Sequence, residues 1–261
     1  MPAPTSRTRT LAVCGALVTA LLAVAALAPL PFSIAQPGDT ANVLGEYRGK
    51  PVITVTGDPG DGDRPSEGEL LATTIAATSS DTTVRLADVL RGWFDTDRAV
   101  MPRASVYPVG DDPAEIKEHI DAQMRESQDV AVTAALRELG LRKEEVEVEL
   151  RLADVGGPSA GLLFALGIID KVDGDDLTGG RTIAGTGTID ADGRVGPVGG
   201  VPLKTQAARR DGATVFLVPE AECGTARAEL PDGLRLVPVT TLGGALDALD
   251  ALRDGGRVPS C

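Results

Sequence analysis

One serine of this chain lies in a sequence context that favours nucleophilic chemistry. Ser159 follows Gly156-Gly157-Pro158 and precedes an apolar run at 162–169. Proline is typical of the first helical turn, so we expect Ser159 near the start of a buried helix, where backbone N–H groups have no partner. Those N–H groups and the helix dipole would stabilise a developing negative charge, as a serine nucleophile requires. The alternative interpretation is an ordinary serine at a helix start.

A serine hydroxyl needs a base to remove its proton, and Lys204 is the candidate base. Its neighbours Val201, Leu203 and Ala207 are apolar, which favours burial and a neutral amine. The alternative is a solvated lysine on an amphipathic helix, as most lysines are. The only histidine, His119, lies on a predicted long helix far from Ser159 in sequence, which disfavours a serine–histidine–acid triad.

Two other stretches of the chain resemble known binding sites but lack residues or spacings that those sites require. The stretch 199–205 resembles a phosphate-binding loop, but Leu203 stands where that loop requires glycine before the lysine. The acidic turn 173–176 lacks the spacing of a calcium loop. With one histidine and scattered cysteines we expect no metal site, and nothing indicates a cofactor.

Strands and helices alternate in the half of the chain that contains Ser159 and Lys204, which predicts a mixed α/β (α+β) fold. The expected strands are 51–56, 69–76, 146–152, 182–189, 214–219 and 234–239. The first two are candidates for a hairpin. The expected helices are 84–94, 111–139, the one after Pro158, 201–211 and 242–252.

These residues resemble the proteolytic domain of the Lon-type serine peptidases, which use a Ser–Lys dyad. Residues 157–161 are similar to the family's nucleophile motif, and residues 193–204 to its lysine motif. The resemblance implies that Ser159 and Lys204 are catalytic, that Thr186 of the Thr186-Gly187 pair supports the lysine, and that Gly157 supports the nucleophile turn. It covers roughly residues 45–252, most strongly 124–220, and predicts a Lon proteolytic-domain-like fold.

Within this family the chain is most similar to bacterial membrane-anchored Lon-like proteins, with four departures. Only residues 140–145 separate the predicted long helix from the strand before Ser159, which leaves no room for an inserted PDZ domain. No ATPase module is present, so ATP-independent activity is expected. Glycines occupy 156–157, where many members have an acidic residue, and Glu145 and Glu147 replace the histidines of the preceding strand.

The N-terminus carries an export signal. Arg7 and Arg9 precede an apolar run from Leu11 to Leu30, which is about long enough to span a bilayer and predicts a cytoplasmic N-terminus. We favour an uncleaved anchor with the catalytic domain outside the cell membrane. The alternative is a signal peptide cleaved after Ser33-Ile34-Ala35, which would give a secreted protein.

The resulting division of the chain has five parts. They are a cytoplasmic tail (1–10), an anchor (11–31, or a signal peptide to about 35), a linker (36–44), the Lon-like domain (45–252) and a C-terminal tail (253–261). On this topology Cys223 and Cys261 lie outside the membrane and could form one disulfide or remain two free thiols.

Composition limits the partners of the protein. Apolar residues make up 43% of the 261 residues, which indicates a globular chain, and the formal net charge of −13 disfavours nucleic-acid binding. The expected partners are protein or peptide substrates and the membrane, and the family resemblance implies a homo-oligomer. We therefore expect a membrane-anchored serine endopeptidase. The alternative is a catalytically silent scaffold or binding module on the same fold.

Overall fold

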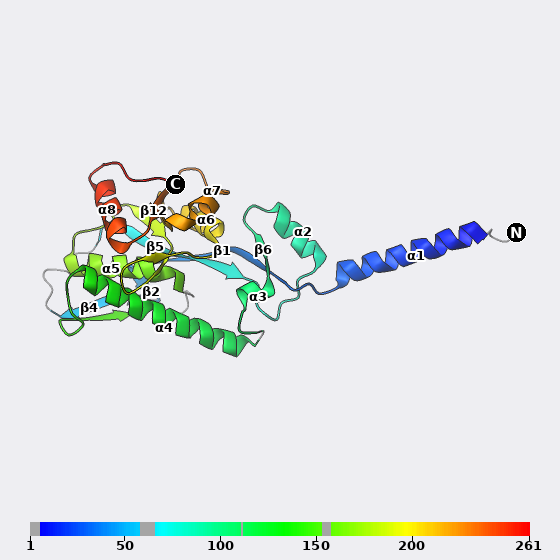
Figure 1. Cartoon of the computed structure of the whole chain (residues 1–261), viewed down its shortest axis with the longest axis horizontal. Helices are drawn as coiled ribbons and strands as arrows, with labels where there is room; N and C mark the ends of the chain where they lie inside the picture. Colours follow the sequence, from blue (N-terminus) through cyan, green and yellow to red (C-terminus); the bar gives the residue numbers. More distant parts are fainter. Residues whose placement is uncertain (1–5, 58–65, 111, 153–157) are drawn as a thin grey trace. The chain divides into compact units, whose positions relative to one another are not determined.

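The computed structural model describes residues 6–57, 66–110, 112–152 and 158–261, which form two compact units (Figure 1). Unit 1 comprises Met1–Ala35 and Ala77–Pro113, and unit 2 comprises Gln36–Ala76 and Ala114–Cys261. Each unit is described by itself. The segment 77–113 therefore groups with the N-terminal residues, although the sequence places it within the domain expected at 45–252.

Unit 1 contains the long apolar helix expected at the N-terminus. Its elements are α1 (Ser6–Leu27), the first residues of β1 (Phe32–Asn42), α2 (Leu86–Phe94), β6 (Ala99–Pro102) and α3 (Arg103–Val106). Residues Phe32–Ala35 of β1 pair antiparallel with β6. Within α1, the stretch Arg9–Leu27 is long and apolar enough to cross a membrane and is not buried by other described residues. It fits a membrane anchor or a signal sequence.

Unit 2 is a mixed α/β structure, as the sequence predicts. Its strands are the rest of β1, β2 (Glu46–Tyr47), β3 (Lys50–Pro51), β4 (Ile53–Gly57), β5 (Glu69–Ala77), β7 (Val146–Leu150), β8 (Thr182–Gly185), β9 (Thr188–Ile189), β10 (Val195–Gly196), β11 (Val215–Pro219) and β12 (Arg235–Val239). Its helices are α4 (Pro113–Glu138), α5 (Gly161–Asp173), α6 (Val201–Arg210), α7 (Cys223–Arg227) and α8 (Leu242–Arg253), with 3₁₀ turns η1 (Pro158–Ala160) and η2 (Glu220–Glu222).

The main sheet of unit 2 separates α5 from α6. Its strand order is β12-β11-β8-β5-β1, and β5, β8, β11 and β12 run parallel. Alternate residues of the central strands belong to two different cores. Ile183 and Leu217 pack in the core that contains α5, while Ala184 and Phe216 pack in the core that contains Val201 of α6. This period of two results from the strand geometry, in which successive side chains point to opposite faces.

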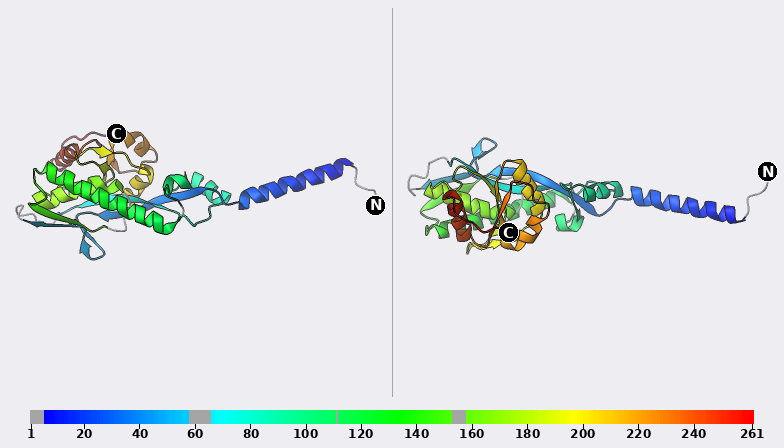
Figure 2. Two further views of the ribbon diagram at one scale, coloured as in Figure 1. Left: turned by 60° about the horizontal axis from the view of Figure 1, so that its bottom comes forward. Right: turned by 90° about the horizontal axis from the view of Figure 1, so that it is seen from above.

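Helix α5 is the centre of the larger core. Every residue from Gly161 to Ile169 is buried, as the unbroken apolar run predicts. Leu163 approaches Gly185 of β8, and Gly167 approaches Ile53 of β4, so α5 lies between the main sheet and the β4–β7 pair. Helix α8 also packs against α5, and α6 packs against α7 (Figure 2). The position of α5 thus fixes the direction of the Ser159 turn that precedes it.

The expected hairpin between residues 51–56 and 69–76 is wrong. β4 pairs antiparallel with β7, with Ile53 opposite Leu150 and Val55 opposite Val148. β5 instead pairs parallel with β8. The physical reason is visible in the two patterns, because β4 and β7 both alternate apolar and polar residues, whereas β5 is buried on both faces over its first half.

Most of the expected linker at 36–44 is also not a linker. It belongs to strand β1, despite the turn formers Pro37 and Gly38. Gly38 is required by a close backbone approach, since a Cβ there would lie 2.8 Å from the carbonyl carbon of Thr74 in β5. The expected strand 182–189 is also divided, because the chain leaves the sheet at Thr186-Gly187 between β8 and β9.

Candidate active site

The candidate site is built where the chain leaves strand β8. Thr186 follows Gly185 directly, and its N–H donates to the carbonyl of Leu217 in β11 at 3.1 Å. The Thr73 hydroxyl of β5 donates to the Gly185 carbonyl at 3.0 Å. Thr186 itself has no exposed surface. Two neighbouring strands therefore fix the peptide group between Gly185 and Thr186.

The Ser159 turn is hydrogen-bonded to this strand end. Ser159 lies in the 3₁₀ turn η1 directly before α5 and is half-buried. Its carbonyl accepts from the N–H of Gly187 at 2.8 Å, and the N–H of Leu162 donates to the Gly187 carbonyl at 3.1 Å. Gly161 allows the close packing here, because a Cβ at that position would lie 3.1 Å from both Ser127 and Ile189 side chains.

Lys204 approaches from the opposite face of the sheet on helix α6. The helix begins after Gly200, which has a left-handed backbone (φ +70°) and leaves no space for a side chain, since a Cβ would lie 2.9 Å from Ile75. Lys204 is one turn into α6, and its N–H donates to the Gly200 carbonyl at 3.1 Å. Its side chain extends toward the end of β8.

The lysine side chain is buried among apolar groups. Lys204 is 3% exposed, and its helical neighbours Leu203 and Ala207 are buried as well. Burial disfavours the ammonium form and lowers the pKa of Lys204 from 10.5 to about 8, and no carboxylate of the described residues offsets this effect. A substantial fraction of Lys204 is therefore a neutral amine near pH 8.

Thr186 connects the lysine to the serine turn. Lys204 Nζ donates to Thr186 Oγ1 at 3.0 Å, and Thr186 Oγ1 donates to the Ser159 carbonyl oxygen at 3.1 Å. Because the threonine proton is directed at Ser159, Thr186 Oγ1 can only accept from the lysine. One N–H of a neutral Lys204 is then held on Thr186, and its lone pair remains available to accept a proton elsewhere.

Of the residues expected at the site, three are brought together. Ser159, Thr186 and Lys204 come from the turn before α5, the end of β8 and helix α6, while Gly157 lies outside the described residues. Ser127 of α4 is a contributor that we did not assign a role from sequence. Its hydroxyl donates to the Pro158 carbonyl at 3.2 Å. The only signal for it was that Ser127 falls within residues 124–220, where the family resemblance is strongest.

A basic cleft borders the same turn of α4. It has a volume of about 560 Å³, and five cationic side chains and one carboxylate line it, together with Tyr47, Met124, Gln128, Leu150 and Leu152. The charged residues are Arg48, Lys50, Lys117, Asp121, Arg125 and Arg151. Met124 and Gln128 flank Ser127, which holds the residue before Ser159. The cleft is locally positive although the chain has a net charge of −13.

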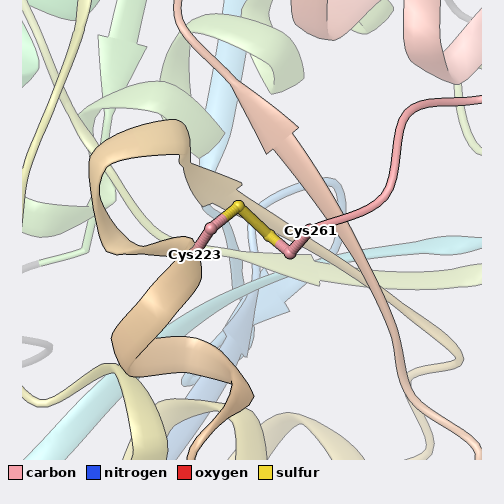
Figure 3. The surroundings of a disulfide bond; sticks show 2 residues. All are labelled: Cys223 and Cys261. Atoms are coloured by element: carbon pink, nitrogen blue, oxygen red, sulfur yellow. A yellow bond between two sulfur atoms is a disulfide. The ribbon is translucent and has the colours of Figure 1, made fainter.

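The structure contains a disulfide between Cys223 and Cys261 (Figure 3). Cys223 begins helix α7, and Cys261 is the last residue, so the bond ties the C-terminal segment to the body of unit 2. The sequence left disulfide and free thiols open as alternatives for this pair. Cys14, in α1, is a free exposed cysteine.

In a comparison with known protein families, residues 116–249 match the Lon protease (S16) C-terminal proteolytic domain. The match covers just over half of the 261 residues and includes α4, the Ser159 turn, β8 and α6.

Curated relatives give the same family. The chain is 31% identical over 121 residues to Lon protease 2 of Bacillus subtilis (strain 168), which is 45% of this chain and 21% of the relative. It is 37% identical over 91 residues to Lon protease of Rhizobium meliloti (strain 1021), covering 33% and 11%. It is 42% identical over 79 residues to Lon protease of Clostridioides difficile (strain 630), covering 30% and 10%. The chain thus spans at most about a fifth of the length of these three relatives.

Proposed function

Because the chain belongs to the family of Lon protease (S16) C-terminal proteolytic domains, we propose that it is a serine endopeptidase in which Ser159 is the nucleophile and Lys204 the general base. The observation that carries the proposal is the hydrogen-bond chain from Lys204 through Thr186 to the Ser159 backbone. A buried lysine with a lowered pKa is the second support, since only the neutral amine can act as a base.

In the proposed mechanism the Ser159 hydroxyl proton passes to Lys204 Nζ while Oγ attacks the carbonyl carbon of a peptide bond. Backbone N–H groups near Gly157 and Ser159 stabilise the resulting oxyanion, and each such donor is typically worth about 3 kcal/mol. The Lys204 ammonium then protonates the leaving amine, and an acyl-enzyme remains on Ser159. Water attacks this ester, its proton passes to Lys204, and the carboxylic acid product leaves with Ser159 restored.

Thr186 is the positioning residue in this scheme. It fixes the rotation of Lys204 Nζ through one hydrogen bond and holds the Ser159 carbonyl through the other. Helices α5 and α6 lie on opposite faces of the sheet. The Thr186 hydroxyl group links Lys204 on α6 to the Ser159 turn that precedes α5. A small movement of either helix would separate base and nucleophile, and misplacement by about 1 Å can cost about 10²-fold in rate.

We further propose that the peptidase is anchored in the cell membrane by α1, acts without ATP, and faces outside. The basic residues Arg7 and Arg9 precede the apolar stretch of α1, which favours a cytoplasmic N-terminus. The disulfide between Cys223 and Cys261 favours an oxidising compartment for unit 2. Cleavage after Ala35 would divide β1, whose residues Ser33 and Ala35 are buried, so an uncleaved anchor fits this strand better.

The basic cleft is where we place the polypeptide substrate. It borders the α4 turn that holds Pro158, and its positive lining favours acidic segments through charge complementarity. The substrates proposed are therefore extracytoplasmic proteins or peptides with acidic residues near the cleaved bond.

The function is tested with a serine-reactive fluorophosphonate probe and a fluorescent peptide library, each with and without ATP. We expect labelling and cleavage by the native chain, loss of both in Ser159→Ala, and strong loss in Lys204→Ala. Full peptidase activity in either variant would refute the dyad. If the native chain neither labels nor cleaves between pH 6 and pH 10, the catalytically silent scaffold is the better assignment.

A further inference from the structure

Helix α2 of unit 1 presents an apolar face to solvent. Outside α1, the described residues include six large apolar side chains that are strongly exposed, and four of them belong to α2. These four, which we call the α2 apolar face, are Leu86, Leu90, Trp93 and Phe94, with exposed fractions of 36%, 43%, 69% and 84%. Their spacing of four, three and one residues places them on one side of a helix.

The apolar face is distinct from the side through which α2 packs. The buried residues of α2 are Val89 and Gly92, and Gly92 lies against Val100 of β6 within the same unit. Trp93 and Phe94 are therefore not core residues, although their size would favour burial. Contiguous exposed apolar groups on a soluble surface usually mark an interaction site.

The chain connection places α2 close to the end of α1. α1 ends at Leu27, and the N–H of Leu30 donates to the carbonyl of Val84 at 2.8 Å, two residues before α2 begins. Three residues span at most about 10 Å. A second bond, from the Arg103 N–H to the Pro31 carbonyl at 3.0 Å, attaches α3 to the same point of the chain.

The segment that leads into α2 is also fixed. The Arg103 guanidinium donates to the carbonyl of Ser80 at 2.9 Å and to that of Thr82 at 2.7 Å. These bonds hold the chain between β5 and α2, so the apolar face is presented by an ordered segment of unit 1.

The length of α1 and its short separation from α2 can be compared with the thickness of the layers of a bilayer. The apolar stretch of α1, Arg9–Leu27, has 19 residues and would span about 28 Å as a helix, close to the hydrocarbon thickness of about 30 Å. If α1 spans the membrane, Leu27 lies at the outer edge of the hydrocarbon, and α2 begins within or next to the headgroup layer. Tryptophan is enriched at this depth because its ring is apolar and its N–H is polar.

We propose that α2 is an interfacial helix that inserts Leu86, Leu90, Trp93 and Phe94 into the outer leaflet of the membrane that α1 crosses. The proposal rests on the proposed anchoring by α1 and not on catalysis. It gives the chain two membrane contacts, one spanning and one lying in the interface, so that unit 1 is held in a defined orientation on the bilayer.

Trp93 is the only tryptophan of the chain, so its fluorescence reports on this face alone. The full chain is reconstituted in phosphatidylcholine vesicles that contain a minor fraction of phosphatidylglycerol. We expect lipids brominated near the headgroup to quench Trp93 several-fold more strongly than lipids brominated near the chain ends. If Trp93 is quenched by neither lipid and remains accessible to aqueous iodide, the proposal is wrong. A Trp93 shielded from both iodide and lipid bromine would show that protein covers the face, which also refutes it.

A matched pair of variants separates insertion from anchoring. Leu90→Ser with Phe94→Ser removes half of the apolar face and keeps Trp93, while Arg91→Lys changes an exposed residue outside the apolar face and keeps its charge. The double variant is expected to lose most of the bromine quenching while still sedimenting with the vesicles, and Arg91→Lys is expected to behave as the native chain. Unchanged quenching in the double variant would refute insertion.

Sedimentation of the native chain separates the two proposals. Native chain recovered in the supernatant would refute both anchoring and insertion, whereas sedimentation of native chain with unquenched Trp93 would refute insertion alone.

Discussion

Lys204 Nζ and Thr186 Oγ1 form a hydrogen bond of 3.0 Å in which both side chains are buried. The bond joins helix α6 to the end of β8, and Thr186 continues it to the Ser159 carbonyl. A buried amine with an uncharged partner is a poor place for an ammonium ion. The geometry therefore favours the neutral amine of Lys204, which can accept a proton. The first three predictions below test this protonation state.

The first prediction concerns the pH dependence of cleavage. Burial lowers the pKa of Lys204 to about 8, and the neutral amine above that pH is the active form. We expect kcat/KM to rise with pH through a midpoint near 8, by about tenfold for each pH unit below it. The measurement is a pH–rate profile on an uncharged peptide. A profile that is flat between pH 6 and pH 9 would contradict a lysine base.

The second prediction concerns Thr186. Thr186→Val removes both hydrogen bonds while it keeps the shape of the side chain. In the proposed mechanism Lys204 becomes an ammonium as it takes the Ser159 proton, and a hydrogen bond to a charged group is worth about 1.5–3 kcal/mol. We expect kcat to fall by about 10–100-fold with little change in KM, because Thr186 acts through Lys204 rather than on the substrate. The pH midpoint should also move.

Thr186→Ser is the matched control, since it keeps the hydroxyl group. It should restore most of the activity and the native pH midpoint. Equal losses of kcat in the valine and serine variants would mean that the threonine acts through packing and not through its hydroxyl.

The third prediction concerns stability. The pKa of Lys204 falls from 10.5 to about 8 on folding, which costs on the order of 3 kcal/mol at neutral pH. The unfolded chain binds more protons than the folded chain between these two values, so the cost is present in full below pH 8 and is relieved as the pH rises toward 10.5. Lys204→Met should therefore be more stable than the native chain at pH 7, by about 2 kcal/mol once the lost Thr186 bond is counted.

Urea unfolding at pH 7 and pH 9.5 measures this effect. The stability advantage of Lys204→Met should shrink at the higher pH. Lys143→Met is the control, because Lys143 is exposed and should show no such advantage at either pH. A Lys204→Met chain that is less stable than the native chain at pH 7 would show that burial of Lys204 does not destabilise the folded chain.

The sequence predicted the local parts of this site better than their assembly. The unbroken apolar run after Ser159 predicted a buried helix, and α5 is buried along that run, because such a pattern has no polar face to expose. The strand before this helix was predicted within two residues, whereas the expected strand 182–189 is divided into β8 and β9, and the hairpin between residues 51–56 and 69–76 was wrong. Strand pairing depends on partners distant in sequence, and Ile53 meets Leu150 rather than its neighbour in the chain.

The roles of single residues show the same limit. The proximity of Thr186 to Lys204 could be expected from family resemblance, whereas the contact between Ser127 and Pro158 had no local sequence signal. Gly38 illustrates the opposite error, because a glycine after proline indicates a turn, yet here it permits close packing of β1 on β5. Trp93 is a further example, because its size and apolar ring favour burial, yet it is 69% exposed.

The fourth prediction concerns the disulfide. Cys223 and Cys261 are separated by 38 residues, and closing a loop of that length stabilises a folded chain by about 4 kcal/mol in the chain-entropy account. We expect Cys223→Ser with Cys261→Ser to lower the melting temperature, and dithiothreitol to lower that of the native chain by a similar amount. Dithiothreitol should not affect the double variant. Equal melting temperatures for native and variant chains under oxidising conditions would show that the bond does not form in solution.

The fifth prediction concerns the basic cleft and substrate charge. Arg125 is exposed and lines the cleft on the same turn of α4 as Ser127. Arg125→Glu changes the local charge by two units, and interactions between charges near a protein surface are worth about 1 kcal/mol or more. We expect kcat/KM to fall about fivefold for a peptide with aspartate near the cleaved bond and to be unchanged or raised for the corresponding lysine peptide.

Lys143→Glu makes the same charge change outside the cleft, so it should leave the ratio of the kcat/KM values for the two peptides unaltered. If both variants changed that ratio equally, the net charge of the protein rather than the cleft would select the substrate. If neither variant changed it, the substrate would not pass along this surface, and the cleavage rates should also lose their dependence on salt, because charge steering weakens as ionic strength rises.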